Sequence, residues 1–114
     1  MKVHKDIPYL NHMLDAINDI EESIKNLSKK EFIINKDVKD ANIRRLEIIG
    51  EAAKNLSKKI KDKNSDIEWK KIAGTRDIVV HHYFGIDHDI VWNIIKKDLP
   101  ILKKEIEKIK IDRQ

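Results

Sequence analysis

The sequence lacks cysteine and has few glycines, prolines and aromatic residues: three, two and six among 114 residues. Without cysteine there are no disulfides, thiolate zinc sites or cysteine nucleophiles, which agrees with a reducing compartment. So few glycines and prolines do not supply the turns that a β-sandwich or barrel needs about every 8 to 12 residues. No apolar run approaches the roughly 18 residues of a membrane span, and residues 1–10 lack a signal-peptide core. We expect a soluble, cytoplasmic, helical protein.

Isoleucine and lysine are abundant, with 21 and 20 copies. The length fits one compact domain, so we expect a single domain over residues 1–114. The net charge is 24 − 20 = +4, and the surplus lies in residues 54–76. Lysines there could attract phosphates, although the solvated face of a lysine-rich helix is the simpler interpretation. The lysines in question are Lys54, Lys58, Lys59, Lys61 and Lys63.

Apolar spacing predicts helices along most of the chain. Apolar residues at steps of three and four between residues 10 and 27 predict a first helix, with Asp6 as its cap and Pro8 in its first turn. Residues 32–34 are apolar but too short a run to classify. A long second helix is predicted from about Asp37 to Lys63.

The second half of the sequence predicts shorter pieces. A helix containing Trp69 ends or bends at Gly74, and Thr75 caps the next piece, which stops at Gly85. Asp87 caps a last helix, which proline at position 100 kinks or restarts. The expected fold is all-α, an antiparallel up-down bundle of four principal helices.

Two places in this pattern favour close contacts. Gly50, with the alanines that follow it, would let another backbone come close to the middle of the second helix. Tyr83, Phe84 and Trp92 gather around Gly85, where an isolated monomer would prefer polar residues, so a partner is expected to cover them.

Residues 75–85 (TRDIVVHHYFG) hold the densest reactive chemistry in the sequence. A histidine such as His81 can move a proton near neutral pH. The Arg76 guanidinium can bind two non-bridging phosphate oxygens and stabilise charge at phosphorus. The Tyr83 hydroxyl can orient a phosphate. Together the three residue types can carry out phosphodiester chemistry without a metal.

Helical geometry restricts how these residues can meet. Asp77 and His81 are four residues apart and share a face, so the carboxylate could orient the imidazole. Arg76 and His81 are five residues apart, about 140° around a helix, and are not neighbours on one face. Either Arg76 lies in an irregular entrance at Gly74 and Thr75, or a second copy faces the first across a two-fold axis. We favour the dimeric site.

Other interpretations of the motif remain. The histidines could simply lie on a helix surface. A metal site built from Asp77, His81, His82 or His88 is less favoured, because adjacent histidines point to different faces and no HExxH pattern is present. No phosphate-binding loop, dinucleotide-binding motif or GxSxG elbow occurs in the sequence, and we expect neither a metal nor a cofactor.

The motif RDIVVHHY, residues 76–83, reads as RxxxxHxY and resembles the signature of HEPN domains, specifically that of the HepT-type toxins. Residues 48–53 (IIGEAA) resemble the IGEA segment in the long helix of that family. Residues 69–74 (WKKIAG) and 83–87 (YFGID) are similar to the flanks of the motif. The resemblance covers essentially the whole chain.

This resemblance implies a five-helix bundle that forms a homodimer or higher assembly, with two motifs in one cleft, acting as a metal-independent endoribonuclease on RNA. It implies that Arg76 and His81 are catalytic, with Asp77 in support. It also implies a toxin–antitoxin system, in which a minimal nucleotidyltransferase of the MntA type neutralises the toxin by attaching AMP to Tyr83. The added phosphate is anionic and bulky, so it would oppose RNA binding.

Three alternatives stay open. Glu51 is either a third supporting member of the site or a buried or interface carboxylate that pairs with Arg76 or a backbone donor. Trp69 and Trp92 could stack on bases, although this spacing is more typical of core residues. The chain could also be a non-catalytic helical binding partner, the substrate-binding subunit of a nucleotidyltransferase.

Overall fold

The structure is a computed structural model that describes residues 3–85 and 88–112, and the side chains of residues 5–77 and 88–112. Every regular element in these ranges is a helix. Four are long: α1 (Val3–Ile24), α3 (Lys36–Lys54), α5 (Trp69–Gly85) and α7 (Leu99–Asp112). Between them lie the short helices α2 (Lys29–Ile34), α4 (Lys58–Lys63) and α6 (His88–Asn93), and a π-helical segment, η1 (Ile94–Asp98).

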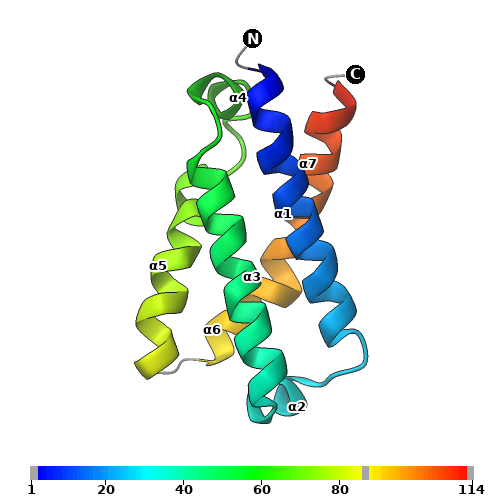
Figure 1. Cartoon of the computed structure of the whole chain (residues 1–114), viewed down its shortest axis with the longest axis vertical. Coiled ribbons are helices and arrows are strands. Elements are labelled where there is room, and N and C mark those ends of the chain that lie inside the picture. Colours follow the sequence, from blue (N-terminus) through cyan, green and yellow to red (C-terminus); the bar gives the residue numbers. More distant parts are fainter. Residues whose placement is uncertain (1–2, 86–87, 113–114) are drawn as a thin grey trace.

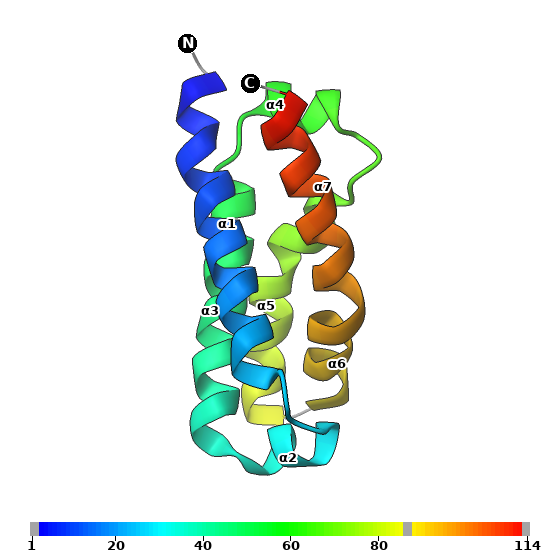
Figure 2. The ribbon, with the colours of Figure 1, turned by 90° about the vertical axis from the view of Figure 1, so that its right-hand side faces the viewer.

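The long helices form an antiparallel bundle. Figure 1 shows α1 and α5 running in one direction and α3 and α7 in the other, with α3 between α1 and α5. Turned by 90°, α6, η1 and α7 form one nearly continuous column beside α1 (Figure 2). The predicted all-α up-down bundle is therefore confirmed; its homodimeric assembly stays a prediction.

The core is built mostly from isoleucine and leucine, as the spacing predicts. Helices α1, α3 and α7 each bury an apolar stripe, and burial of such stripes drives helices together. Among the described side chains of α5, Trp69 is buried and Ile72 is partly buried. Among the described helices, none is long and apolar enough to cross a membrane. The largest of the almost fully buried side chains are Asp6, Leu10, Met13, Ile17, Ile20, Phe32, Asn42, Leu46, Ile49, Ile60 and Ile106.

Asp6 does not cap the first helix, contrary to the expectation. Helix α1 begins at Val3, so Asp6 lies inside the helix, and Pro8 lies beyond its first turn. The Asp6 carboxylate, 2% exposed, accepts hydrogen bonds from the Ser57 backbone N–H at 2.8 Å and from the Ser57 hydroxyl at 2.6 Å. It therefore joins the start of α1 to the start of α4.

Residues 32–34, left unclassified above, belong to the short helix α2. Ser28 and Glu31 form a capping box: the Glu31 N–H donates to the Ser28 hydroxyl and the Ser28 N–H donates to the Glu31 carboxylate. The hydrogen bond from the Ser28 backbone N–H, followed by that from the Ser28 side chain, lowers the pKa of Glu31. The box turns buried Phe32 toward Trp92, 5.2 Å away between ring centroids.

The predicted long helix from Asp37 to Lys63 is wrong in its last third. Helix α3 ends at Lys54, Asn55 is its C-cap, and Ser57 starts α4 by accepting from the Ile60 N–H. Apolar residues keep their helical spacing across the break between α3 and α4, so this periodicity did not reveal the end of α3. Side-chain hydrogen bonds to backbone groups ended the helix instead.

The last column contains a widened turn before Pro100. In η1 the Leu99 N–H donates to the Ile94 carbonyl, five residues back. Proline has no N–H and its ring clashes with the carbonyl four residues earlier, so a wider turn relieves that clash. The helix thus restarts near Pro100, as expected. The predicted cap at Asp87 lies outside the described residues.

Candidate active site

Helix α5 carries the RxxxxHxY motif in regular backbone. The Trp69 N–H donates to the Ile67 carbonyl at 2.9 Å, and the Trp69 indole N–H donates to the Asn64 carbonyl at 3.1 Å, which ties the start of the helix to the end of α4. From there α5 continues through Gly74 to Gly85. The expected end of the helix at Gly74 is therefore wrong.

Thr75 has a different role from the predicted cap. Its side chain is buried, with 8% exposure, and its hydroxyl donates to the Lys71 carbonyl at 3.2 Å within the same helix. This bond satisfies the hydroxyl without interrupting the helix. An irregular entrance at Gly74 and Thr75, one of the two ways to bring Arg76 to His81, is therefore excluded.

Arg76 lies where α5 crosses α3. A Cβ placed on Gly50 would lie 3.1 Å from the Arg76 Cβ, 3.2 Å from the Arg76 nitrogen and 3.2 Å from the Ala73 carbonyl oxygen. Gly50 thus permits the close approach that the sequence predicted for this part of α3. The Arg76 side chain extends from the crossing and is 51% exposed.

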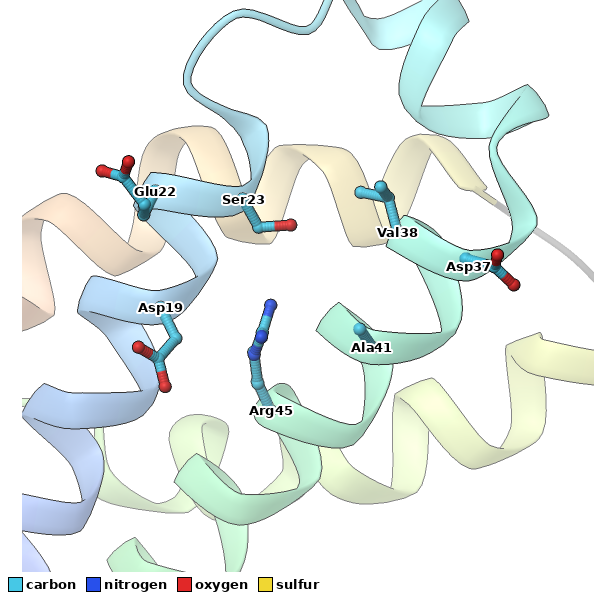
Figure 3. Close-up of a pocket in the computed structure, with 7 residues that line it drawn as sticks. All are labelled: Asp19, Glu22, Ser23, Asp37, Val38, Ala41 and Arg45. Atoms are coloured by element: carbon cyan, nitrogen blue, oxygen red, sulfur yellow. The ribbon is translucent and has the colours of Figure 1, made fainter.

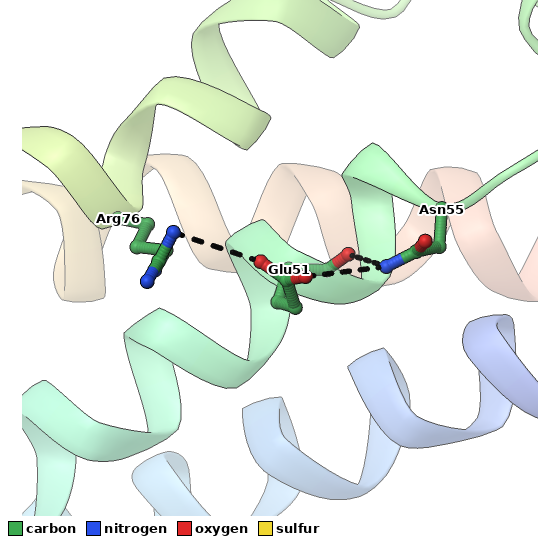
Figure 4. Close-up of polar contacts among 3 residues, drawn as sticks. All are labelled: Glu51, Asn55 and Arg76. Carbon is green, nitrogen blue, oxygen red and sulfur yellow. Dashed lines mark hydrogen bonds and ion pairs between the residues drawn. The ribbon is translucent and has the colours of Figure 1, made fainter.

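Glu51 follows Gly50 and faces this arginine (Figure 4). The Arg76 Nη1 and the Glu51 Oε2 are 3.8 Å apart, and the Glu51 side chain is 54% exposed. The predicted pairing of Glu51 with Arg76 is present, but the carboxylate is not buried. It is an exposed anion beside an exposed guanidinium.

Asn55 is a member of this cluster that sequence reasoning missed. Its Nδ2 donates to the Glu51 carbonyl oxygen at 2.8 Å and lies 3.5 Å from the Glu51 Oε1. The only signal in the sequence was the spacing of an amide four residues after a glutamate. That spacing is common on helices and gave no reason to choose this pair.

The remaining motif residues are placed by the register of α5. Asp77 is exposed. Position 81 is four residues later, on the same stripe as Asp77, and position 83 is seven residues after Arg76, on the stripe of Arg76. The side chains of His81, His82 and Tyr83 lie outside the described residues.

The predicted lysine patch is divided by the end of α3. Lys54, Lys58, Lys59 and Lys63 are exposed. Lys61 instead donates from its Nζ to the Lys54 carbonyl at 3.3 Å, which satisfies a free carbonyl at the end of α3. Part of the basic character of this segment therefore serves the fold.

A hollow of about 360 Å³ between α1 and α3 contains a second arginine (Figure 3). Arg45 donates to the Asn42 side-chain oxygen at 2.9 Å, and the fully buried Asn42 donates to the Ser23 hydroxyl at 3.1 Å. The carboxylates of Asp19, Glu22 and Asp37 line the same hollow. Negative charge there disfavours a phosphate, so Arg76 is the better phosphate ligand of the two.

The tryptophans belong to the core rather than to an open stacking surface. Trp69 is 8% exposed and its indole N–H is hydrogen-bonded. Trp92 is partly buried, packs against Phe32 and has the Lys96 Nζ 5.5 Å from its ring centroid. Base stacking on either ring would require rearrangement of these contacts.

Metal ligands do not cluster in the part of the chain whose side chains are described. Within residues 5–77 and 88–112, no three histidine, cysteine, aspartate or glutamate side chains converge as metal ligands do. The histidines at 81 and 82 lie outside these ranges, so the expectation of a metal-free site stays a prediction.

The chain is similar to several proteins named as ribonucleases. The family model described as "Ribonuclease HepT-like" matches residues 13–109. A Methanocaldococcus jannaschii protein named "Gamma-glutamylcyclotransferase and putative RNase" is 47% identical over 108 residues, covering 94% of this chain and 49% of that protein. A "Putative RNase" of Caldanaerobacter subterraneus subsp. tengcongensis is 42% identical over 102 residues, covering 90% of this chain and 91% of the relative. A "Probable ribonuclease HepT" of Thermococcus cleftensis is 40% identical over 107 residues, covering 94% and 96%.

The chain therefore spans about half the length of the first relative and nearly the whole length of the other two. The comparison with solved structures gives no significant match.

Proposed function

We propose that this chain, which belongs to the HepT-like ribonuclease family, is the toxin of a toxin–antitoxin system in the cytoplasm. It cleaves RNA without a metal ion, in a cleft shared by two copies of the chain. Arg76 and His81 are the catalytic residues, and Asp77 and Glu51 support them.

The observation that carries this proposal is the exposed Arg76 guanidinium on an unbroken helix. Its contact with Glu51 is too long for a hydrogen bond, at 3.8 Å. The five guanidinium donors therefore remain available to phosphate oxygens. The same helix bears the histidine of the motif about 1.4 turns later.

The reaction follows from these residue types. His81 takes the proton of a ribose 2′-hydroxyl, whose oxygen attacks the adjacent phosphorus. Arg76 binds the non-bridging oxygens as negative charge increases on them. The bond from phosphorus to the 5′-oxygen breaks, the leaving oxygen receives a proton, and a 2′,3′-cyclic phosphate remains on the other fragment.

The continuity of α5 supports a dimeric site. Because the helix is regular from Trp69 to Gly85, Arg76 and position 81 remain about 140° apart around its axis. One phosphate cannot reach both stripes of a single helix easily. A second copy related by a two-fold axis would bring the Arg76 of one protomer toward the His81 of its partner.

Regulation by an MntA-like nucleotidyltransferase is the second part of the proposal. The Tyr83 hydroxyl oxygen attacks the α-phosphorus of ATP, forms an adenylyl ester and releases pyrophosphate. Position 83 lies on the stripe of Arg76, about 10.5 Å further along the axis. An anionic phosphate there would occupy the space of the RNA phosphate and compete for the guanidinium.

The nuclease activity is tested with purified protein and RNA in excess EDTA. The wild type should cleave RNA, and His81→Ala and Arg76→Ala should lose most of that activity. In cells, expression of the wild type alone should arrest growth and His81→Ala should relieve the arrest. Equal cleavage or toxicity of the mutants would exclude the catalytic roles, and absence of cleavage by the wild type would favour the non-catalytic partner of a nucleotidyltransferase.

The modification is tested by the intact mass of the chain after co-expression with a neighbouring nucleotidyltransferase gene. The mass should increase by whole AMP groups in the wild type and stay unchanged in Tyr83→Phe. An AMP increment that persists in Tyr83→Phe would place the acceptor elsewhere.

A further inference from the structure

We propose that Gly50 and Asn55, both in or at the end of α3, are positioning residues for Arg76. Gly50 sets where the Arg76 backbone lies, and Asn55 acts through Glu51 on where the guanidinium points. This inference rests on the proposed function, in which Arg76 contacts the RNA phosphate.

Gly50 determines the distance between α3 and α5 at Arg76. Two of the three atoms closest to an added Cβ belong to Arg76, at 3.1 and 3.2 Å, and the third is the Ala73 carbonyl oxygen at 3.2 Å. Two of these atoms are backbone, which cannot rotate away. A methyl group at position 50 would therefore move α5 by a few tenths of an ångström at Arg76 itself.

Asn55 and Arg76 share the Glu51 carboxylate (Figure 4). The Asn55 Nδ2 lies 3.5 Å from the Oε1, and the Arg76 Nη1 lies 3.8 Å from the Oε2. Asn55 is itself held, because the same Nδ2 donates to the Glu51 carbonyl at 2.8 Å. The amide thus lies beside one oxygen of the carboxylate, and the other oxygen faces the guanidinium.

The geometry indicates that Glu51 orients the Arg76 side chain and does not neutralise its charge. The pair is 3.8 Å long with both side chains about half exposed, and such exposed pairs contribute little to stability. The distance is too long for a hydrogen bond, so the guanidinium donors can still bind a phosphate. Loss of the pair should therefore affect the reaction rate more than folding or RNA affinity, since small misplacements of a reacting group slow catalysis strongly.

The first experiment separates rate from affinity. Cleavage of a mixed-sequence single-stranded RNA is followed under single-turnover conditions, and binding is measured with the 2′-O-methyl form, which has no attacking hydroxyl. Gly50→Ala, Glu51→Gln and Asn55→Ala should each lower the rate, by about tenfold for Gly50→Ala, without weakening binding. Glu68→Gln is the matched control, because Glu68 forms an equally long exposed pair with Lys71, also 3.8 Å.

The double variant Glu51→Gln/Asn55→Ala tests whether Asn55 acts through Glu51. If it does, the double variant should be no slower than Glu51→Gln alone, because the same contact is lost. Additive losses, or losses no larger than that of Glu68→Gln, would overturn the inference. Circular dichroism verifies that each variant folds. If Gly50→Ala fails to fold, the rates of the Glu51 and Asn55 variants still test whether Asn55 acts through Glu51.

A second measurement does not depend on activity. The ¹H–¹⁵N NMR signal of the Arg76 Nε reports the mobility of its side chain, with exposed Arg44 as the reference for a free guanidinium. Arg76 should be more ordered than Arg44 in the wild type, and should become as mobile as Arg44 in Asn55→Ala and Glu51→Gln. Unchanged order in both variants would overturn the positioning role. If the wild type cleaves no RNA, the proposed function fails and this comparison still stands.

Discussion

Asp6 and Glu51 are carboxylates that each join two helices, in opposite surroundings. Asp6 is 2% exposed and accepts two hydrogen bonds from Ser57, at 2.8 and 2.6 Å. Glu51 is 54% exposed and lies 3.8 Å from Arg76. Both oxygens of the first carboxylate are hydrogen-bonded within the fold. The second leaves its partner free to bind something else, which is what a phosphate site requires.

The comparison teaches how to separate structural from functional polar contacts in this bundle. Burial and short distances indicate a contact that stabilises the folded state, since a buried polar group that loses its partner costs free energy. Exposure and a long distance indicate a contact with little stability to lose. Four predictions test this separation.

The largest effect is expected at Asp6. Asp6→Ala would leave the Ser57 N–H and hydroxyl without their acceptor and lower the free energy of unfolding by about 3 kcal/mol. Urea denaturation measures this, with Asp15→Ala on the same helix as an exposed control that should change stability by less than about 0.5 kcal/mol. Equal stability of the two variants would contradict the conclusion that the buried Asp6 contact stabilises the folded state.

Arg76 should show the reverse behaviour. Arg76→Lys should leave the free energy of unfolding within about 0.5 kcal/mol of the wild type, as for most surface changes. Cleavage should fall about 100-fold, because an ammonium cannot offer the planar pair of donors. Arg44→Lys on α3 is the control. Full activity of Arg76→Lys would mean that only the charge is needed.

The capping box at Ser28 and Glu31 combines exposed side chains with short hydrogen bonds, so it tests which of the two properties determines stability. Ser28 and Glu31 are exposed but bonded at 2.9 and 3.1 Å. Ser28→Ala should lower the free energy of unfolding by about 1 kcal/mol, the usual contribution of an N-cap. Thermal denaturation beside Ser65→Ala, an exposed serine in the loop before α5, measures it. No difference between the two would mean that exposure alone makes a contact dispensable.

The smallest effect concerns pH and Glu31. Hydrogen bonds from Ser28 lower the pKa of Glu31 below its value in the unfolded chain. Its contribution to stability is therefore present above the unfolded pKa and lost as the pH falls through the folded pKa. The stability difference between the wild type and Glu31→Gln should shrink as the solution is acidified. A difference that grows on acidification would contradict this sign.

Much of the fold could be predicted because helical periodicity is local. The stripe from Leu10 to Ile24 is buried as its spacing predicted, apart from Leu14, which is partly buried. Helix ends were less predictable. The break after Lys54 depends on caps at Asn55 and Ser57, and apolar spacing passes through it without change.

The site could be predicted in part. The motif itself marks Arg76, and its pairing with Glu51 was one of two roles open for that carboxylate. The regular passage of α5 through Gly74 could not be predicted, since a glycine in that position can equally end a helix. The role of Asn55 could not be predicted, because an amide four residues after a glutamate is a common spacing on helices.

By itself, the sequence determined the helical class, the buried stripes and the order of residues in RxxxxHxY, because these depend on residue type and on spacings of a few positions. Only the tertiary structure decided that Asp6 bonds to Ser57, 51 residues away, and that Gly50 meets Arg76. The physical reason is that these contacts depend on how whole helices cross. Many residues contribute to a crossing, and no short pattern encodes it.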